Sequence, residues 1–142
     1  MEENTQELMN ELRKENDIYQ FTRENESVFI EKPLVSYLED LLKKTNSRKA
    51  DIIKRAGLST VYGYQIFDGK REPKRDKVIQ IAVGFGLCVE ETQRLLKISG
   101  HSELYPKVKR DALFIYGIHN RLNIDEIEEL LYDMGEKGLD IN

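Results

Sequence analysis

Apolar residues recur at helical spacing along most of this 142-residue chain. Between residues 34 and 42, positions 34, 35, 38, 41 and 42 are apolar, which is the spacing of one face of an amphipathic helix. Pro33 precedes them, and proline suits the first turn of a helix. Almost every other signal along the chain is also helical, so the pattern predicts an all-α fold.

Two short helices are predicted next, separated by a tight turn. Residues 47–56 carry apolar residues on one side and basic residues elsewhere, with Ser47 as the expected N-cap. Gly57 suits the end of this helix, and Ser59 suits the cap of the next one, which extends over 59–68. Two helices joined in this way predict a helix-turn-helix motif.

The second half of the chain contains an internal repeat. Residues 75–100 align with residues 110–135 without a gap, at an offset of 35. The identical pairs are Arg75/Arg110, Asp76/Asp111, Leu87/Leu122, Glu91/Glu126, Leu95/Leu130, Leu96/Leu131 and Gly100/Gly135. Matched helix starts, turns and stops predict that each copy is a helical hairpin. The first hairpin is expected to complete the helix-turn-helix core, and the second to pack beside it.

Polar residues at the expected helix starts support this interpretation. Asp76 and Asp111 fall in first turns, where negative charge is favourable for the helix dipole. Asn123 and Glu126 have the spacing of a capping box. In the first copy, Cys88 stands at the position that Asn123 occupies in the second. We therefore expect Cys88 to be a small, half-buried cap residue rather than a nucleophile.

The N-terminal segment shows a weaker pattern. Leu8, Met9 and Leu12 predict a short amphipathic helix. Further apolar residues follow at Phe21, Val28, Phe29 and Ile30. Either this segment packs over the helical core, or it is an arm that contributes to a dimer. The predicted organisation is a helical arm over 1–33, a helix-turn-helix domain over 34–100 and a C-terminal helical hairpin over 101–142.

Charge is distributed unevenly along the chain. The net charge of −4 is the sum of −7 over residues 1–42, +7 over residues 43–77 and −4 over residues 78–142. The basic block of 43–77 surrounds the predicted motif. Such charge occurs on ordinary solvated helix faces, and it is also what a phosphate-facing patch requires.

Other chemistry is weakly supported by the sequence. Cys88 is the single cysteine, so no internal disulfide is possible, and a reducing cytoplasm is the expected location. No apolar run approaches membrane-spanning length, and the first residues lack the apolar core of a signal peptide. His101 and His119 have no further metal ligands at suitable spacing, and no phosphate loop or serine elbow occurs. We therefore expect no metal, no cofactor and no enzymatic activity.

A segment of about forty residues resembles a known family. The motifs are Ile52-Ile53-x-x-x-Gly57-Leu58-Ser59, Ile66-x-x-Gly69-Lys70-Arg71-x-Pro73 and Val78-Ile79-x-Ile81-Ala82-x-x-Phe85-Gly86-Leu87. Their order and spacing within 46–87 resemble the phage-repressor-type (XRE) helix-turn-helix family. The resemblance implies a lambda-repressor-like helix-turn-helix bundle, here extended by a second, repeated helical hairpin.

The resemblance also implies a function. In that family the second helix of the motif, here 59–68, enters the major groove of double-stranded DNA. The residues that this assigns to the bases are Thr60, Val61, Tyr62 and Gln65. Those that it assigns to phosphates are Arg48, Lys49, Lys70, Arg71 and Lys74. The expected protein is a sequence-specific, DNA-binding transcriptional regulator that acts as a homodimer.

Three residues depart from the family pattern. The family usually has a branched apolar residue at Gly63, a glutamate at Phe67 and an apolar residue at Arg75. Close packing on the preceding helix would explain Gly63, with Phe67 filling the adjacent volume. The alternative is that Tyr62, Tyr64 and Phe67 form an aromatic 62–67 surface for a protein partner. The protein would then be a protein-protein interaction module on a helix-turn-helix frame.

Overall fold

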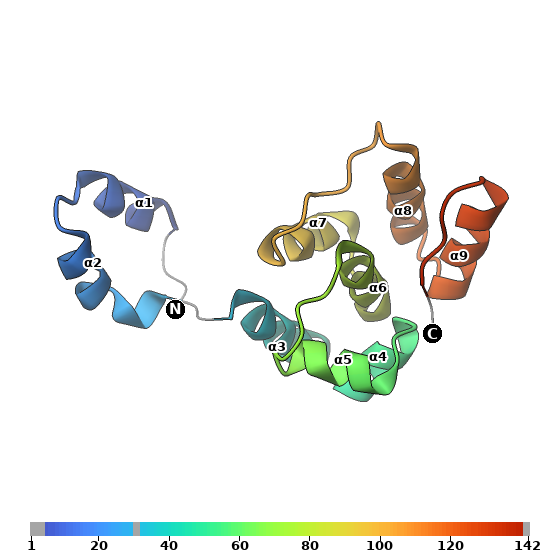
Figure 1. The fold of residues 1–142 in the computed structure, drawn as a ribbon, viewed down its shortest axis with the longest axis horizontal. Helices are drawn as coiled ribbons and strands as arrows, with labels where there is room; N and C mark the ends of the chain where they lie inside the picture. The colour runs from blue at the N-terminus through green and yellow to red at the C-terminus, as the bar shows by residue number, and fades with distance from the viewer. Residues whose placement is uncertain (1–4, 30–31, 141–142) are drawn as a thin grey trace. The chain divides into compact units, whose positions relative to one another are not determined.

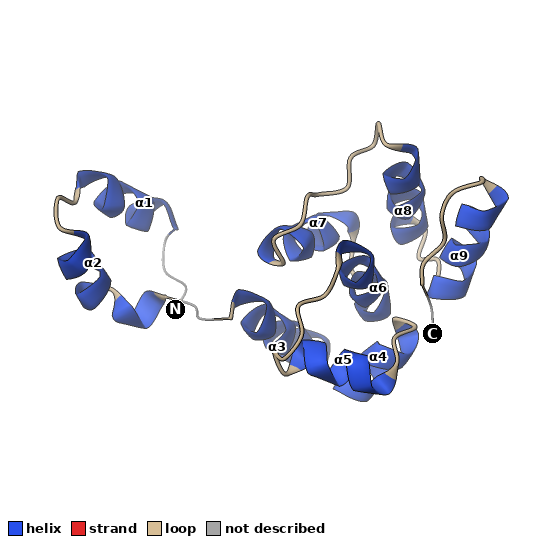
Figure 2. Ribbon diagram, in the orientation of Figure 1, coloured by secondary structure: helices blue, strands red, loops and turns tan. Residues whose placement is uncertain are grey.

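The computed structural model describes residues 5–29 and 32–140 of the chain, and Ile30 lies outside these ranges. Helices joined by turns make up the described parts, as Figure 2 shows, and the predicted all-α class is confirmed. The chain divides between residues 31 and 32 into two compact units. Among the described residues, no helix combines the length and the apolar character that crossing a bilayer requires.

The N-terminal unit contains helix α1 (Thr5–Lys14), helix α2 (Ile18–Glu24) and the 3-10 helix η1 (Glu26–Val28). The predicted helix over Leu8 to Leu12 is therefore confirmed. Asp17 caps α2, because its Oδ1 accepts hydrogen bonds from the amides of Tyr19 and Gln20. Phe21 is buried and meets the exposed Phe29 edge-on, with 6.4 Å between ring centroids. Whether this unit is an arm or a cover stays a prediction.

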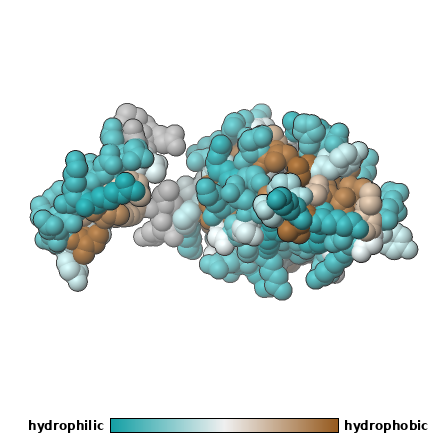
Figure 3. Space-filling model, turned by 90° about the horizontal axis from the view of Figure 1, so that it is seen from above, coloured by the Kyte–Doolittle hydropathy of each residue, from teal (hydrophilic) through white to brown (hydrophobic). Residues whose placement is uncertain are grey.

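The second unit begins with α3 (Pro33–Thr45), α4 (Lys49–Arg55), α5 (Thr60–Phe67), α6 (Arg75–Phe85) and α7 (Val89–Ile98). Helix α6 lies at the centre of this unit and packs on both α4 and α7, while α5 packs on α3 and α4 (Figure 1). The core between them is formed by buried aliphatic side chains, including Leu38, Ile52, Ile66, Ile79 and Leu96. Hydrophilic residues surround smaller apolar patches on the face of this unit seen in Figure 3.

The turn between α4 and α5 follows the prediction, whereas the cap predicted at the start of α4 does not. Gly57 adopts a left-handed φ of 72°, which a residue with a side chain rarely takes. Ser59 caps α5, because its Oγ accepts from the amide of Tyr62 at 3.3 Å. The predicted cap at Ser47 is wrong, since α4 begins after Arg48 and the Ser47 hydroxyl bonds to Thr45 at the end of α3.

The second hairpin consists of α8 (Lys109–His119) and α9 (Ile124–Asp133). The predicted capping box is present, because Asn123 and Glu126 exchange two backbone-to-side-chain hydrogen bonds of 2.9 Å. Cys88 is half-buried at the equivalent cap, where its amide donates to Glu91 at 3.1 Å. The two copies thus begin their second helices in the same way.

The structural repeat extends beyond the predicted boundaries. Leu104 and Leu139, which are again 35 residues apart, are both buried. Their amides donate to Gln93 and Glu128, which are also equivalent, at 2.7 Å in each copy. Each copy therefore includes the loop that folds back after its second helix.

A reciprocal clamp, formed by Arg75 with Asp111 and by Arg110 with Asp76, joins the two hairpins. Arg75 donates from Nη1 and Nη2 to the two carboxylate oxygens of Asp111, both at 2.9 Å. Arg110 donates in the same way to Asp76, also at 2.9 Å. Each arginine thus binds the aspartate of the other copy, which is the self-complementary pattern of a two-fold-related interface. The predicted first-turn positions of both aspartates are confirmed, and the clamp accounts for Arg75.

The same arginines secure the loops that follow each hairpin. Arg75 donates to the carbonyl oxygens of Ser102 and Glu103, and Arg110 donates to those of Lys137 and Gly138. Burial would raise the pKa of Asp111, but hydrogen bonds from Arg75 and from the Tyr105 amide outweigh it and lower that pKa. The hydrogen bond to Asp76 raises the pKa of Arg110 above its ordinary value.

Candidate nucleic-acid interface

The inner face of α5 is fixed by close packing. A Cβ atom added to Gly63 would lie 2.5 Å from Cγ2 of Ile53, so no side chain fits at this position without a shift of Ile53. One turn later, Phe67 is buried and its ring lies 6.3 Å from that of Phe85. The close-packing interpretation of Gly63 is confirmed, and both residues belong to the core side of α5.

The outer face of α5 carries the residues predicted to contact bases. Val61 is 69% exposed, Thr60 is also exposed, and Tyr62 and Gln65 are half-buried. Tyr64 is 37% exposed, whereas Phe67 is buried, so the residues of the predicted aromatic surface do not share one exposed face. The structure brings the four predicted base-contacting residues together on one short helix.

Arg71 folds back over this helix from the following turn. Its amide donates to the carbonyl oxygen of Gln65 at 3.2 Å, and its Nε donates to Oε1 of Gln65 at 3.3 Å. Its guanidinium carbon lies over the Tyr62 ring, 5.2 Å from the centroid, which is a cation–π distance. The sequence assigned Tyr62 and Gln65 to bases and Arg71 to a phosphate, and the structure joins them into an Arg71–Gln65–Tyr62 cluster.

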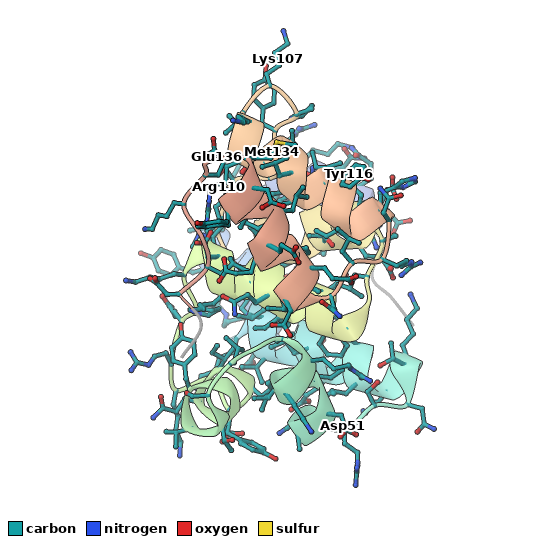
Figure 4. All side chains as sticks on the ribbon, turned by 90° about the vertical axis from the view of Figure 1, so that its right-hand side faces the viewer. Asp51, Lys107, Arg110, Tyr116, Met134 and Glu136 are labelled. Carbon is teal, nitrogen blue, oxygen red and sulfur yellow. The ribbon has the colours of Figure 1, made fainter. Side chains whose placement is uncertain are left out.

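The predicted phosphate-binding residues fall into two groups. Arg48 pairs with Asp51 at 3.1 Å, and Lys49 pairs with Asp68 at 3.6 Å. Ion pairs at such exposed positions contribute about 0–1 kcal/mol, so a phosphate could compete with either carboxylate. In the second group, Lys70, Arg71 and Lys74 are exposed, and none has an acidic partner within the described ranges. Figure 4 shows Asp51 at the end of the unit opposite to Lys107.

An open cleft of about 380 Å³ lies between the turn before α5 and the start of α6. Its lining residues are Gly57, Leu58, Ser59, Tyr62, Arg71, Lys74, Lys77 and Asp140. Three of these, Arg71, Lys74 and Lys77, are cationic. Sequence reasoning missed Lys77 and Asp140, because the loop that brings Asp140 here follows the second hairpin. Lys77 donates from Nζ to the carbonyl oxygen of Asp140.

The structure does not gather the remaining potential metal ligands into a site within the described ranges. His101 Nε2 lies 2.9 Å from the carbonyl oxygen of Pro73, so this histidine ties the loop after α7 to the turn before α6. Within residues 5–29 and 32–140, no group of three or more potential metal ligands comes together.

Comparisons with known proteins add no family to this description. No family model matches the chain, and no curated protein or solved structure shows significant similarity to it.

Proposed function

We propose that this protein is a sequence-specific DNA-binding regulator that inserts α5 into the major groove, with a lambda-repressor-like arrangement of α4 and α5. The proposed subunits act as a homodimer, since this class of motif reads two half-sites one helical turn apart. In this proposal Thr60 and Val61 meet base edges, and Lys70 and Lys74 meet phosphates.

The observation that carries the proposal is the division of α5 into two faces. The buried face is anchored by Gly63, Ile66 and Phe67, and the opposite face presents Thr60 and Val61 to solvent. Lys70 and Lys74 lie in the turn that follows, without acidic partners among the described residues. An anchored helix with an open outer face and adjacent cations is what entry into a major groove requires.

Fluorescence anisotropy with random-sequence duplex DNA over a salt series tests this proposal. Two phosphate contacts, at Lys70 and Lys74, predict a log-log salt slope of about −2 for each bound subunit. Lys74→Ala should weaken binding to every duplex and reduce this slope by about one. Lys97→Ala is the matched control, because Lys97 is an exposed cation in the last turn of α7. Absence of binding at low salt, or equal effects of both variants, would contradict the proposal.

A second candidate function, a protein-interaction module with an aromatic 62–67 surface, has less support. Phe67 packs in the core, and Tyr62 lies under the Arg71 guanidinium. Tyr64 is the remaining exposed aromatic residue of this segment, and a single exposed tyrosine is common on protein surfaces. We therefore propose DNA, rather than a protein partner, as the ligand of α5.

A further inference from the structure

We propose that Arg71 reads a guanine base and that Gln65 is the residue that positions it. This inference rests on the proposed binding of α5 in the major groove. It changes both assignments made from the sequence, where Arg71 was expected at a phosphate and Gln65 was expected to contact a base.

The first argument is the orientation of the Arg71 side chain. Its Nε is occupied by Gln65 at 3.3 Å, and the face of its guanidinium lies over the Tyr62 ring at 5.2 Å. Within the described ranges, no carboxylate pairs with Nη1 or Nη2. The open edge of the guanidinium therefore carries two parallel N–H donors, which match O6 and N7 of guanine in the major groove.

The second argument is the position of this edge. Gln65 lies one helical turn after Val61, which is predicted to contact bases and is 69% exposed. Arg71 is attached to Gln65 by its backbone amide, at 3.2 Å, as well as by its side chain. The guanidinium thus lies beside the outer face of α5 instead of extending away from the turn. A side chain that only contacts a phosphate does not need to be held by hydrogen bonds from both its amide and its Nε, so these two bonds favour a base contact.

The third argument concerns Gln65. A glutamine reads adenine bidentately, by accepting from N6 with Oε1 while donating to N7 with Nε2. Here Oε1 already accepts from Arg71. Bidentate adenine reading would compete with that hydrogen bond, so Gln65 is assigned the positioning role.

Selection of sites from a random duplex library, followed by sequencing, tests the inference. The wild-type protein should select guanine at one position of each half-site, with roughly 5- to 160-fold discrimination against other bases. Arg71→Lys should lose most of this preference, because lysine keeps the charge but lacks both the planar fork and the Nε donor that Gln65 holds. Preferences at the other positions should remain. Replacement of that guanine by 7-deazaguanine should weaken binding of the wild type and leave Arg71→Lys unaffected.

Variants of Gln65 separate positioning from direct reading. Gln65→Met removes the acceptor and should weaken the preference at the same guanine, with no further loss when combined with Arg71→Lys. Gln65→Glu keeps an acceptor for Nε and should retain the guanine preference, at lower affinity because its carboxylate repels phosphates. Circular dichroism verifies that each variant is folded.

The outcomes distinguish this inference from the proposed function. If the wild type shows no salt-dependent binding to any duplex, the proposed function fails, and this inference fails with it. If the wild type binds selectively but Arg71→Ala, which has no donor for guanine, keeps every base preference, Arg71 does not read a base. In that case the DNA-binding proposal stands and this inference is overturned. A changed preference at a different position in Gln65→Met would overturn the positioning role.

Discussion

Removal of one carboxylate from the reciprocal clamp should have a cost that depends on which pair is broken. The Asp111 side chain is 8% exposed and that of its partner Arg75 is 26% exposed. Asp76 in the other pair is 28% exposed and Arg110 is 19% exposed. Asp111 also accepts a hydrogen bond from the Tyr105 amide at 3.0 Å. Water can therefore compensate the loss of Asp76 better than the loss of Asp111.

The magnitude follows from charge and burial. Opposite charges about 4 Å apart attract by about 4 kcal/mol at an effective dielectric constant of 20, and removing one partner of a fully buried pair costs about 3–5 kcal/mol. Because Arg75 retains contact with water, we expect Asp111→Asn to lower the free energy of unfolding by about 2–4 kcal/mol. For Asp76→Asn, where both partners are reached by water, we expect about 1–2 kcal/mol. Either value is a large part of a typical domain stability of about 5–15 kcal/mol.

Urea denaturation followed by circular dichroism measures both variants. The urea concentration at the midpoint of unfolding should fall. The slope of the unfolding free energy against urea concentration should stay constant, because the surface exposed on unfolding is unchanged. Asp133→Asn, at an exposed position of α9, is the control and should remain within about 0.5 kcal/mol of the wild type. The reasoning is refuted if Asp76→Asn costs as much as Asp111→Asn, or if Asp111→Asn behaves like the control.

Three further predictions concern packing, pH and the cleft. Gly63→Ala should destabilise the fold by about 1–3 kcal/mol in urea denaturation, and less in an Ile53→Ala background; equal losses in both backgrounds would contradict the contact. Since the folded state lowers the pKa of Asp111, its stabilisation is present above about pH 4 and is lost as the pH falls further. Urea midpoints between pH 5 and pH 2 should therefore fall more steeply for the wild type than for Asp111→Asn, and parallel curves would argue against this. Asp140→Asn removes a negative charge beside the cleft, so affinity for random duplex DNA should rise by about two- to fivefold at low salt in anisotropy measurements. Unchanged affinity would show that no phosphate lies in the cleft.

Local signals allowed much of the fold to be predicted. Helix periodicity, Gly57 and the caps at Ser59 and Asn123 depend on residues within one turn of each other, so the sequence carries them directly. Ser47 was assigned wrongly because two hydroxyls compete near the end of α3, and its own bonds with Thr45 replace the cap. Such competition depends on the geometry of a short linker, which residue type alone does not determine.

Contacts between distant segments could not be predicted in the same way. The repeat identified Arg75 and Arg110 as equivalent, but equivalence alone does not tell whether each binds its own copy or the other one. The link between Arg71 and Gln65 depends on the path of the turn after α5, which brings a side chain back over a helix that has already ended. The equivalence of the buried residues Leu104 and Leu139 could have been predicted from the sequence, since extending the same gap-free alignment by four residues reaches them.

The reciprocal clamp has a consequence for molecules at high concentration. Because each hairpin offers the same arginine and the same aspartate, hairpins from two different chains can form the same four hydrogen bonds. The loop between α7 and α8 holds the two hairpins of one chain together and so favours the intramolecular pairing. A shortened loop would favour exchange of α8 and α9 between chains, and the result would be a domain-swapped dimer with an unchanged clamp.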